Sequence, residues 1–205
     1  MTDTTITSLF SVPIYISDTK IKFTKKELAF VKKNKKNPTI NIGNINSKDS
    51  YILERTEFVN IKKILYEKVK DYFDKVLKAV DVEPYITQSW INYTETNQFH
   101  HKHNHPNSLV SGVFYIDADK DKDAIKFFKN NYQQIALKVS DYNQWNSEQW
   151  WFSVSTGHLF LFPSSLDHAV EHKKGNNTRT SIAFNVFIKG NLGDGVALTS
   201  LELKL

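Results

Sequence analysis

The chain has 205 residues, of which 40% are hydrophobic, 13% are aromatic and none is cysteine. This length and composition predict one globular domain with a sizeable core, spanning residues 1–205. The lack of cysteine excludes disulfides and thiolate metal sites, so any metal ion must be bound by nitrogen and oxygen ligands.

The positive net charge of +5 is spread along the chain rather than clustered. The densest basic run is "KKNKKN" at 32–37, which follows a short predicted helix and has the character of a solvated face, so we expect no nucleic-acid partner. The N-terminal segment "MTDTTITSLFSVPIYIS" has no basic leader, and no stretch approaches the length of a membrane span. We therefore expect a cytoplasmic protein with no membrane partner.

Two helices are expected within residues 1–84, where they would pack with an N-terminal strand on the rest of the chain. Thr24 and Glu27 form a capping-box pattern, which predicts a short helix over about 25–34. From Phe58 to Val80, apolar residues recur every three or four positions with charged residues between them. This spacing predicts one long amphipathic helix lying on a core.

The apolar period changes to two at about residue 85. Successive segments that alternate in this way read "YITQSWINYTE", "SLVSGVFYIDA", "AIKFF", "WFSVS", "HLFLFP" and "RTSIAFNVFIK". Short consecutive strands without intervening helices predict an antiparallel sandwich or barrel over residues 85–190. The polar, aromatic-rich segment 129–150 fits either a loop that covers a binding cleft or a surface excursion.

The C-terminal residues 191–205 end in an alternation of leucine with charged residues, "LELKL". This pattern predicts a final edge strand, paired either with "SVPIYI" near the N-terminus or with another subunit. Pairing with another subunit would form a homo-oligomer, which is therefore one of the two alternatives.

Four of the seven histidines lie in the segment "FHHKHNHPNS". In an extended chain His103 and His105 project from the same face, roughly 6 to 7 Å apart along the backbone, so both imidazoles can converge on one ion. A third ligand must come from elsewhere, and His168 follows a later predicted strand and turn. For His100 and His101, the only support for a role as metal ligands is their proximity in sequence. We expect them to face solvent or the entrance of the site.

Taken together, these segments resemble the iron and 2-oxoglutarate dependent oxygenases, in particular the group with a "His-x-His-Pro" segment followed by "Ser-Gly-Val-Tyr-Tyr". The matching segments here are "WIN" at 90–92, "HNHPNSLVSGVFYI" at 103–116 and "GHLFLFPSSLDHAVEH" running to "RTSIAFN" at 179–185. The resemblance covers about residues 85–190. It implies a mainly β fold with flanking helices, a double-stranded β-helix or cupin-like jelly-roll barrel with iron at its open end.

The resemblance also implies that His103, His105 and His168 are the metal ligands. One departure from the superfamily concerns His105, because that position commonly holds Asp or Glu. A neutral imidazole leaves an Fe(II) centre one unit more positive, which should strengthen its attraction for a dianionic 2-oxoacid. Three-histidine sites also hold zinc, or iron in cupin dioxygenases that use no 2-oxoacid.

For the cosubstrate, the resemblance implies that Arg179 pairs with the far carboxylate of 2-oxoglutarate. A guanidinium suits this role because it offers a bidentate match to a carboxylate and keeps its charge when partly buried. Tyr115 and Tyr93 are candidate hydroxyl donors to the same carboxylate. Asn92 and Ser181 are weaker candidates for lining that pocket.

The implied activity is that of an Fe(II)- and 2-oxoglutarate-dependent dioxygenase, which uses O₂ to hydroxylate a substrate and releases succinate and CO₂. The sequence does not identify the primary substrate. One alternative is a cupin-like three-histidine metalloenzyme that does not use 2-oxoglutarate, in which Arg179 would point away from the metal. Another alternative is a non-catalytic jelly-roll binding module, which need contain no metal.

Overall fold

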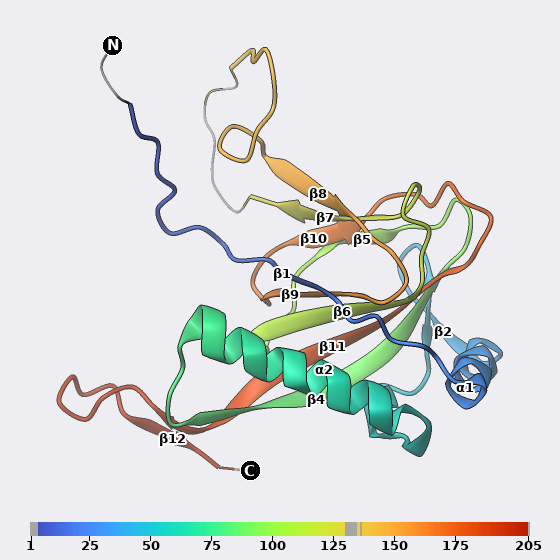
Figure 1. The fold of residues 1–205 in the computed structure, drawn as a ribbon, viewed down its shortest axis with the longest axis horizontal. Helices are drawn as coiled ribbons and strands as arrows, with labels where there is room; N and C mark the ends of the chain where they lie inside the picture. The colour runs from blue at the N-terminus through green and yellow to red at the C-terminus, as the bar shows by residue number, and fades with distance from the viewer. Residues whose placement is uncertain (1–3, 130–134, 136, 205) are drawn as a thin grey trace.

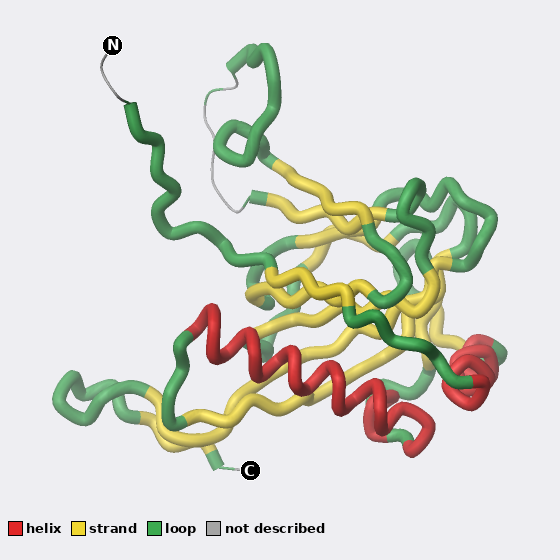
Figure 2. Tube along the Cα trace, viewed as in Figure 1, coloured by secondary structure: helices red, strands yellow, loops and turns green. Residues whose placement is uncertain are grey.

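The computed structural model describes residues 4–129, 135 and 137–204, and its strands form two sheets (Figures 1 and 2). Adjacent named strands pair antiparallel throughout the described chain. The larger sheet has the order β1 (Tyr15–Asp18), β9 (His158–Pro163), β6 (Val110–Asp117), β11 (Arg179–Leu192), β4 (Val82–Thr94), β3 (Ile45–Ser47) and β2 (Pro38–Ile40), with β12 (Leu201–Leu203) beside β11. The smaller sheet has the order β5 (His100–His103), β10 (His168–Val170), β7 (Ala124–Phe128) and β8 (Gln149–Ser153).

The predicted capping box starts α1 (Lys25–Lys35). The Thr24 hydroxyl accepts a hydrogen bond from the Glu27 amide at 3.2 Å, and the Glu27 carboxylate accepts one from the Thr24 amide at 2.6 Å. Each contact satisfies an amide that a helix start leaves free. The short helix predicted from this motif is confirmed.

The long helix expected to reach Val80 ends earlier than predicted. Two short 3-10 turns, η1 (Ile52–Glu54) and η2 (Thr56–Phe58), lead into α2 (Val59–Tyr72), which passes into a π-helical turn, η3 (Phe73–Leu77). Lys78 then adopts a left-handed conformation with φ of 51°, which ends the helix.

Helix α2 lies across one face of the larger sheet (Figure 1). A first core cluster joins its buried residues, Ile61, Leu65 and Val69 among them, to Phe114 and Phe184 of that sheet. A second cluster lies between the two sheets and contains Tyr115, Ile125, Phe127, Val154, Phe160, Phe162 and Leu166. Alternate residues of β6 therefore pack into different core clusters. The face of the larger sheet that points away from α2 faces the smaller sheet, and a site can form between the two.

Strand β12 pairs with β11 through Gly190 and Leu203, whereas β1 pairs with β9. A C-terminal strand is present, but of the two partners considered for it, "SVPIYI" is wrong, because that segment pairs with β9. Part of the predicted loop over 129–150 lies outside the described residues. Within the described chain, no helix is long and apolar enough to cross a lipid bilayer.

Gly112 of β6 is required by the packing of the first core. It pairs with Phe184 of β11, and a Cβ at position 112 would lie 2.1 Å from that ring. We expect Gly112→Ala to lower the free energy of unfolding by about 1–3 kcal/mol, because a buried ring must shift. Thermal unfolding checks this, with Gly195→Ala as the control, since nothing lies within 4 Å of that added Cβ. Equal melting temperatures for the two variants would contradict the packing argument.

Candidate metal and cosubstrate site

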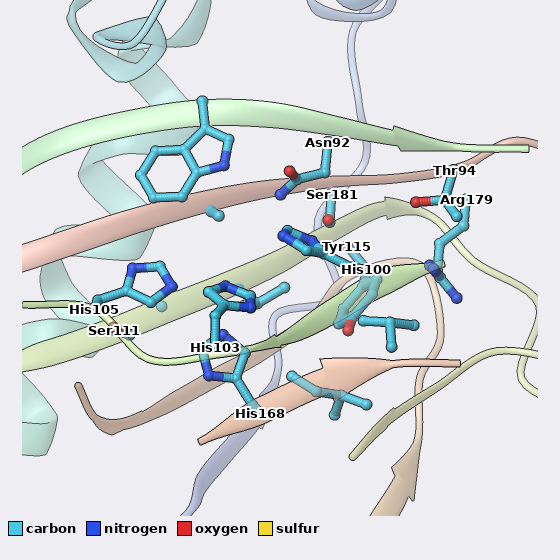
Figure 3. A pocket seen from close by; sticks show the side chains of 16 residues that line it. Asn92, Thr94, His100, His103, His105, Ser111, Tyr115, His168, Arg179 and Ser181 are labelled. Atoms are coloured by element: carbon cyan, nitrogen blue, oxygen red, sulfur yellow. The ribbon is translucent and has the colours of Figure 1, made fainter. Parts of the chain in front are cut away.

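Three histidines meet where β5 and β10 pair (Figure 3). His103 ends β5 directly opposite His168, which begins β10. His105 follows in the loop, where its amide donates a hydrogen bond to the Ser164 carbonyl at 2.9 Å. One ligand atom from each of the three rings lies within 4.8 Å of the other two. The structure therefore brings together the residues that the sequence proposed as metal ligands.

Each ring has its Nδ1 atom next to an oxygen acceptor. The Nδ1 atom of His103 lies 2.8 Å from the His101 carbonyl, and that of His168 lies 3.1 Å from the Leu166 carbonyl. The Nδ1 atom of His105 lies 2.6 Å from Oδ1 of Asn185. Because these oxygens only accept hydrogen bonds, each Nδ1 carries the hydrogen and each Nε2 keeps a free lone pair. Three such nitrogens fit a divalent transition metal.

Burial keeps these imidazoles uncharged. It lowers the pKa of His103 to about 4 and also lowers the pKa values of His105 and His168. The Nε2 atom of His105 is buried and has no hydrogen-bond partner among the described residues. A bound cation would satisfy that lone pair.

A bulge in the ladder between β11 and β4 lies opposite Asn185, where Thr87 and Gln88 of β4 face this single residue of β11. Bulges redirect a side chain and are frequent beside active sites. Here the Asn185 carboxamide reaches His105, so the hydrogen-bond partner of this Nδ1 atom is a side chain rather than the backbone.

His100 lies deeper than expected. We predicted a position facing solvent or the entrance, but the ring lines the cavity and stacks on His103, with centroids 4.5 Å apart. Strand β5, which was not predicted, causes this by pairing His100 with Val170. Ring nitrogens of His100, His101 and His103 also lie within 4.8 Å of one another. We favour the set with His105 and His168, because its members have their Nδ1 atoms anchored.

An inner cavity extends between the sheets from the three histidines to Arg179 and is partly continuous with solvent (Figure 3). Its lining residues are Trp90, Asn92, Thr94, His100, His103, His105, Ser111, Gly112, Val113, Tyr115, Ile125, His168, Val170, Arg179, Ser181 and Ala183. Four of the five residues proposed for cosubstrate binding are in this set, namely Arg179, Tyr115, Asn92 and Ser181.

Tyr93 is the exception. Its side chain joins the first core cluster, and its hydroxyl donates a hydrogen bond to the Val31 carbonyl at 2.7 Å. Successive residues of a strand face opposite sides, so Asn92 and Thr94 reach the cavity while Tyr93 points toward the helices. The structure therefore corrects its expected place in the cosubstrate pocket.

Arg179 opens β11 at the far end of the inner cavity and is 4% exposed. One guanidinium nitrogen donates to Asp123 at 3.3 Å, whereas Nη2 is buried with no partner among the described residues. The Tyr115 hydroxyl is likewise unpartnered, and burial raises its pKa, so it stays a neutral donor. Two unsatisfied donors at one end of a cavity suit a carboxylate.

Asp123 and Lys173 form an ion pair beside Arg179 that the sequence did not indicate. The segments "DADKDKD" and "EHKKGNN" that contain them have the composition of solvated turns. Only long-range packing buries these two side chains, so no local pattern distinguished them from their exposed neighbours.

An outer groove of about 1130 Å³ opens on the other side of the histidines. Its lining residues are Asn41, Asn46, Thr87, Gln88, Trp90, His100, His101, His103, Asn104, His105, Pro106, Asn107 and Asn185. Six of the thirteen lining residues carry carboxamides, and the lining contains no Lys, Arg, Asp or Glu. The groove shares His103 and His105 with the inner cavity, so the three-histidine centre lies between the two spaces.

Comparison with known families gives a match over residues 88–185 to the family described as "Putative 2OG-Fe(II) oxygenase". The matched span contains the three histidines and most of the inner cavity. Residues 88–185, which are 98 of the 205, thus match the model of a 2OG-Fe(II) oxygenase domain. A comparison with curated proteins gives no significant match.

Comparison with solved structures shows which fold the chain has. An oxidoreductase of the 2OG-Fe(II) oxygenase family from Burkholderia pseudomallei has a TM-score of 0.55 at 14% identity, over 84% of this chain and 83% of the other. HygX from Streptomyces hygroscopicus has a TM-score of 0.59 at 9% identity, over 85% of this chain and 82% of the other. A Pseudomonas putida prolyl-4-hydroxylase has a TM-score of 0.56 at 10% identity, over 86% and 92%. The oxygenase domain thus has the jelly-roll fold that the sequence predicted.

Proposed function

We propose that this oxygenase domain binds Fe(II) through the Nε2 atoms of His103, His105 and His168, and binds 2-oxoglutarate with its distal carboxylate against Arg179. The observation that carries the proposal is that three histidines with mutually close ring nitrogens, and Arg179 with an Nη2 that has no partner among the described residues, line one cavity between the sheets. A 2-oxoacid with a second carboxylate at its far end matches both ends of that cavity.

When bound, the metal supplies the O₂ chemistry of the family, in which 2-oxoglutarate is converted to succinate and CO₂ and a substrate is hydroxylated. The protein presents three neutral nitrogens, so the centre is one unit more positive than with two histidines and a carboxylate. Arg179 and the neutral Tyr115 hydroxyl would hold the distal carboxylate, with Asn92 and Ser181 beside it. The two sheets shield this end of the cavity from water.

The direction of Arg179 separates this function from that of a three-histidine metalloenzyme without a 2-oxoacid. Such an enzyme needs no buried cation in its cavity, because it binds no distal carboxylate. Arg179 lines the inner cavity (Figure 3), which supports the use of 2-oxoglutarate.

The primary substrate is proposed to enter through the outer groove. Asn and Gln make up 24 of the 205 residues in the chain, yet they supply six of the thirteen that line this groove. Carboxamides both donate and accept hydrogen bonds, and Trp90 adds an apolar surface. Uncharged, polar molecules are therefore the first to screen, with succinate formation above the substrate-free rate as the measurement.

An anaerobic titration tests the proposal. Protein purified without a histidine tag, so that resin metal is avoided, is mixed with Fe(II) and then with 2-oxoglutarate. We expect a weak visible charge-transfer band, because a 2-oxoacid that chelates Fe(II) gives this absorption. If no band develops and no succinate forms with any member of the substrate panel, the proposed function is wrong.

A further inference from the structure

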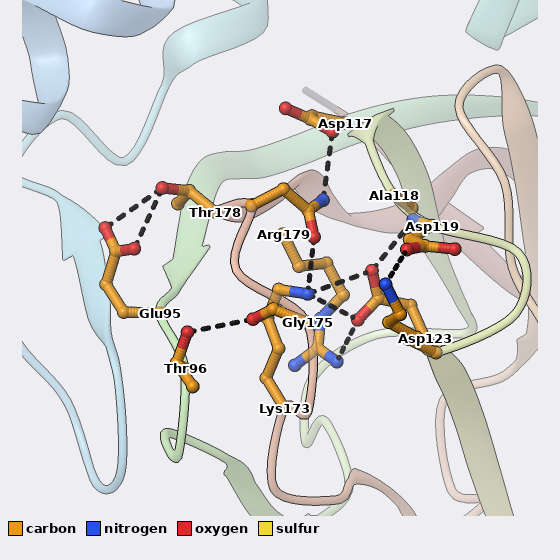
Figure 4. Close-up of polar contacts among 12 residues, drawn as sticks. Glu95, Thr96, Asp117, Ala118, Asp119, Asp123, Lys173, Gly175, Thr178 and Arg179 are labelled. Carbon is orange, nitrogen blue, oxygen red and sulfur yellow. Dashed lines mark hydrogen bonds and ion pairs between the residues drawn. The ribbon is translucent and has the colours of Figure 1, made fainter.

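Two residues outside the inner cavity form a buried ion cluster with Arg179 (Figure 4). The Asp123 side chain is fully buried, as is that of Lys173, and that of Arg179 is 4% exposed. Nζ of Lys173 lies 3.2 Å and 3.4 Å from the two carboxylate oxygens of Asp123. The same carboxylate accepts a hydrogen bond from Arg179 at 3.3 Å.

The cluster contains two cations and one anion, so it carries a surplus of one positive charge. A buried surplus charge is costly unless a counter-ion or hydrogen bonds compensate it. Among the described residues, the remaining hydrogen-bond partner of the Lys173 ammonium group is the Asn177 side-chain oxygen, at 2.8 Å, which is uncharged. The carboxylates of Asp119 and Glu95 act on Lys173 electrostatically, without an ion pair to it within 4.0 Å. The atom left without a partner is Nη2 of Arg179, on a side chain that lines the inner cavity.

Lys173 cannot readily move to solvent. Its backbone amide donates to Gln98 at 2.8 Å, and its carbonyl accepts from Asn97 at 2.9 Å. Thr96 donates to the carbonyl of Gly175 at 2.8 Å, which secures the same loop. A Cβ on Gly175 would lie 2.9 Å from Nζ of Lys173, so the loop closes tightly over the ammonium group.

We propose that Lys173 is a positioning residue for the cosubstrate, acting through Asp123 on Arg179. By neutralising Asp123, Lys173 prevents that carboxylate from cancelling the charge of Arg179, which remains available to the distal carboxylate of 2-oxoglutarate. The inference rests on the proposed function. Lys173 and Asp123 themselves do not line the cavity.

The test is a double-mutant cycle on 2-oxoglutarate binding, measured calorimetrically with Mn(II) in the metal site. We expect Lys173→Met to weaken binding roughly 10- to 100-fold, because Asp123 then competes with the cosubstrate for Arg179. Adding Asp123→Asn removes the competing charge, so the double variant should recover at least half of that loss on a logarithmic scale. A role in stability alone predicts no such recovery.

2-Oxobutyrate is the control ligand, since it has the same 2-oxoacid end but no distal carboxylate. We expect its affinity, and that of Mn(II), to be the same in all variants. If Lys173→Met does not fold, Lys173→Gln removes the charge with less loss of hydrogen bonding and carries the same expectations.

The proposed role of Lys173 would be overturned, with the proposed function left standing, by either of two results. One is unchanged 2-oxoglutarate affinity in the single variant, and the other is an equal loss of affinity for 2-oxoglutarate and 2-oxobutyrate. Absence of 2-oxoglutarate binding to the unmodified protein would instead overturn the proposed function, and with it this inference. Weakening specific to the distal carboxylate, with recovery in the double variant, supports the proposal.

Discussion

In a His168→Ala variant we expect Fe(II) affinity to fall by more than about 100-fold and succinate formation to disappear, because loss of a ligand costs more than loss of a residue that only orients a ligand. His168 is 4% exposed, and its ring lies 4.3 Å from that of His103, centroid to centroid. Metal content after dialysis and a calorimetric Fe(II) titration under anaerobic conditions measure the effect.

His158→Ala is the matched control. His158 lies on β9, where its ring accepts a hydrogen bond from the Ser155 amide at 3.3 Å, and it does not line the inner cavity. This variant should keep the iron affinity of the unmodified protein. Equal iron affinity in the two variants would show that His168 is not a ligand.

Substituting Arg179 with methionine should leave metal binding intact and weaken 2-oxoglutarate by about 30- to 700-fold, which corresponds to about 2–4 kcal/mol. The expected loss is large because the distal carboxylate would then be buried without its cation. The fold should tolerate the change, since Asp123 keeps its ion pair with Lys173. The dissociation constant of 2-oxoglutarate, measured with Mn(II) bound, is the relevant quantity.

Arg55→Met controls for the loss of an arginine. Arg55 forms two hydrogen bonds with Asp49, at 2.6 Å and 3.0 Å, but it is exposed and lies outside the inner cavity. Its substitution should leave 2-oxoglutarate affinity unchanged. The role of Arg179 is wrong if its substitution also leaves that affinity unchanged, or if 2-oxobutyrate binding falls by the same factor.

Much of the fold was predictable because its signals are local. Alternation with a period of two marked the long strands, and a capping box marked the start of α1. The short strands β5 and β10 gave no such signal, because strands this short exist through their pairing partners. Missing β5 led directly to the misplacement of His100.

The candidate site was predictable only in part for the same reason. The spacing of His103 and His105 is local, whereas the burial of Asp123 depends on contacts with Lys173 and Arg179, 50 and 56 positions away. Tyr93 was a different kind of error. Asn92 and Tyr93 are adjacent on one strand, and the pleat alone places only one of them in the cavity.

The side chain of Asn185 connects the outer groove to the three histidines. Its carboxamide lines the outer groove and also orients His105 through a hydrogen bond of 2.6 Å. Any molecule in the groove that competes for this carboxamide alters the hold on one histidine while the other two stay fixed by backbone carbonyls. In the proposed metal centre, His105 is thus held by a side chain and the other two histidines by the backbone, and His105 is one of the residues that line the outer groove.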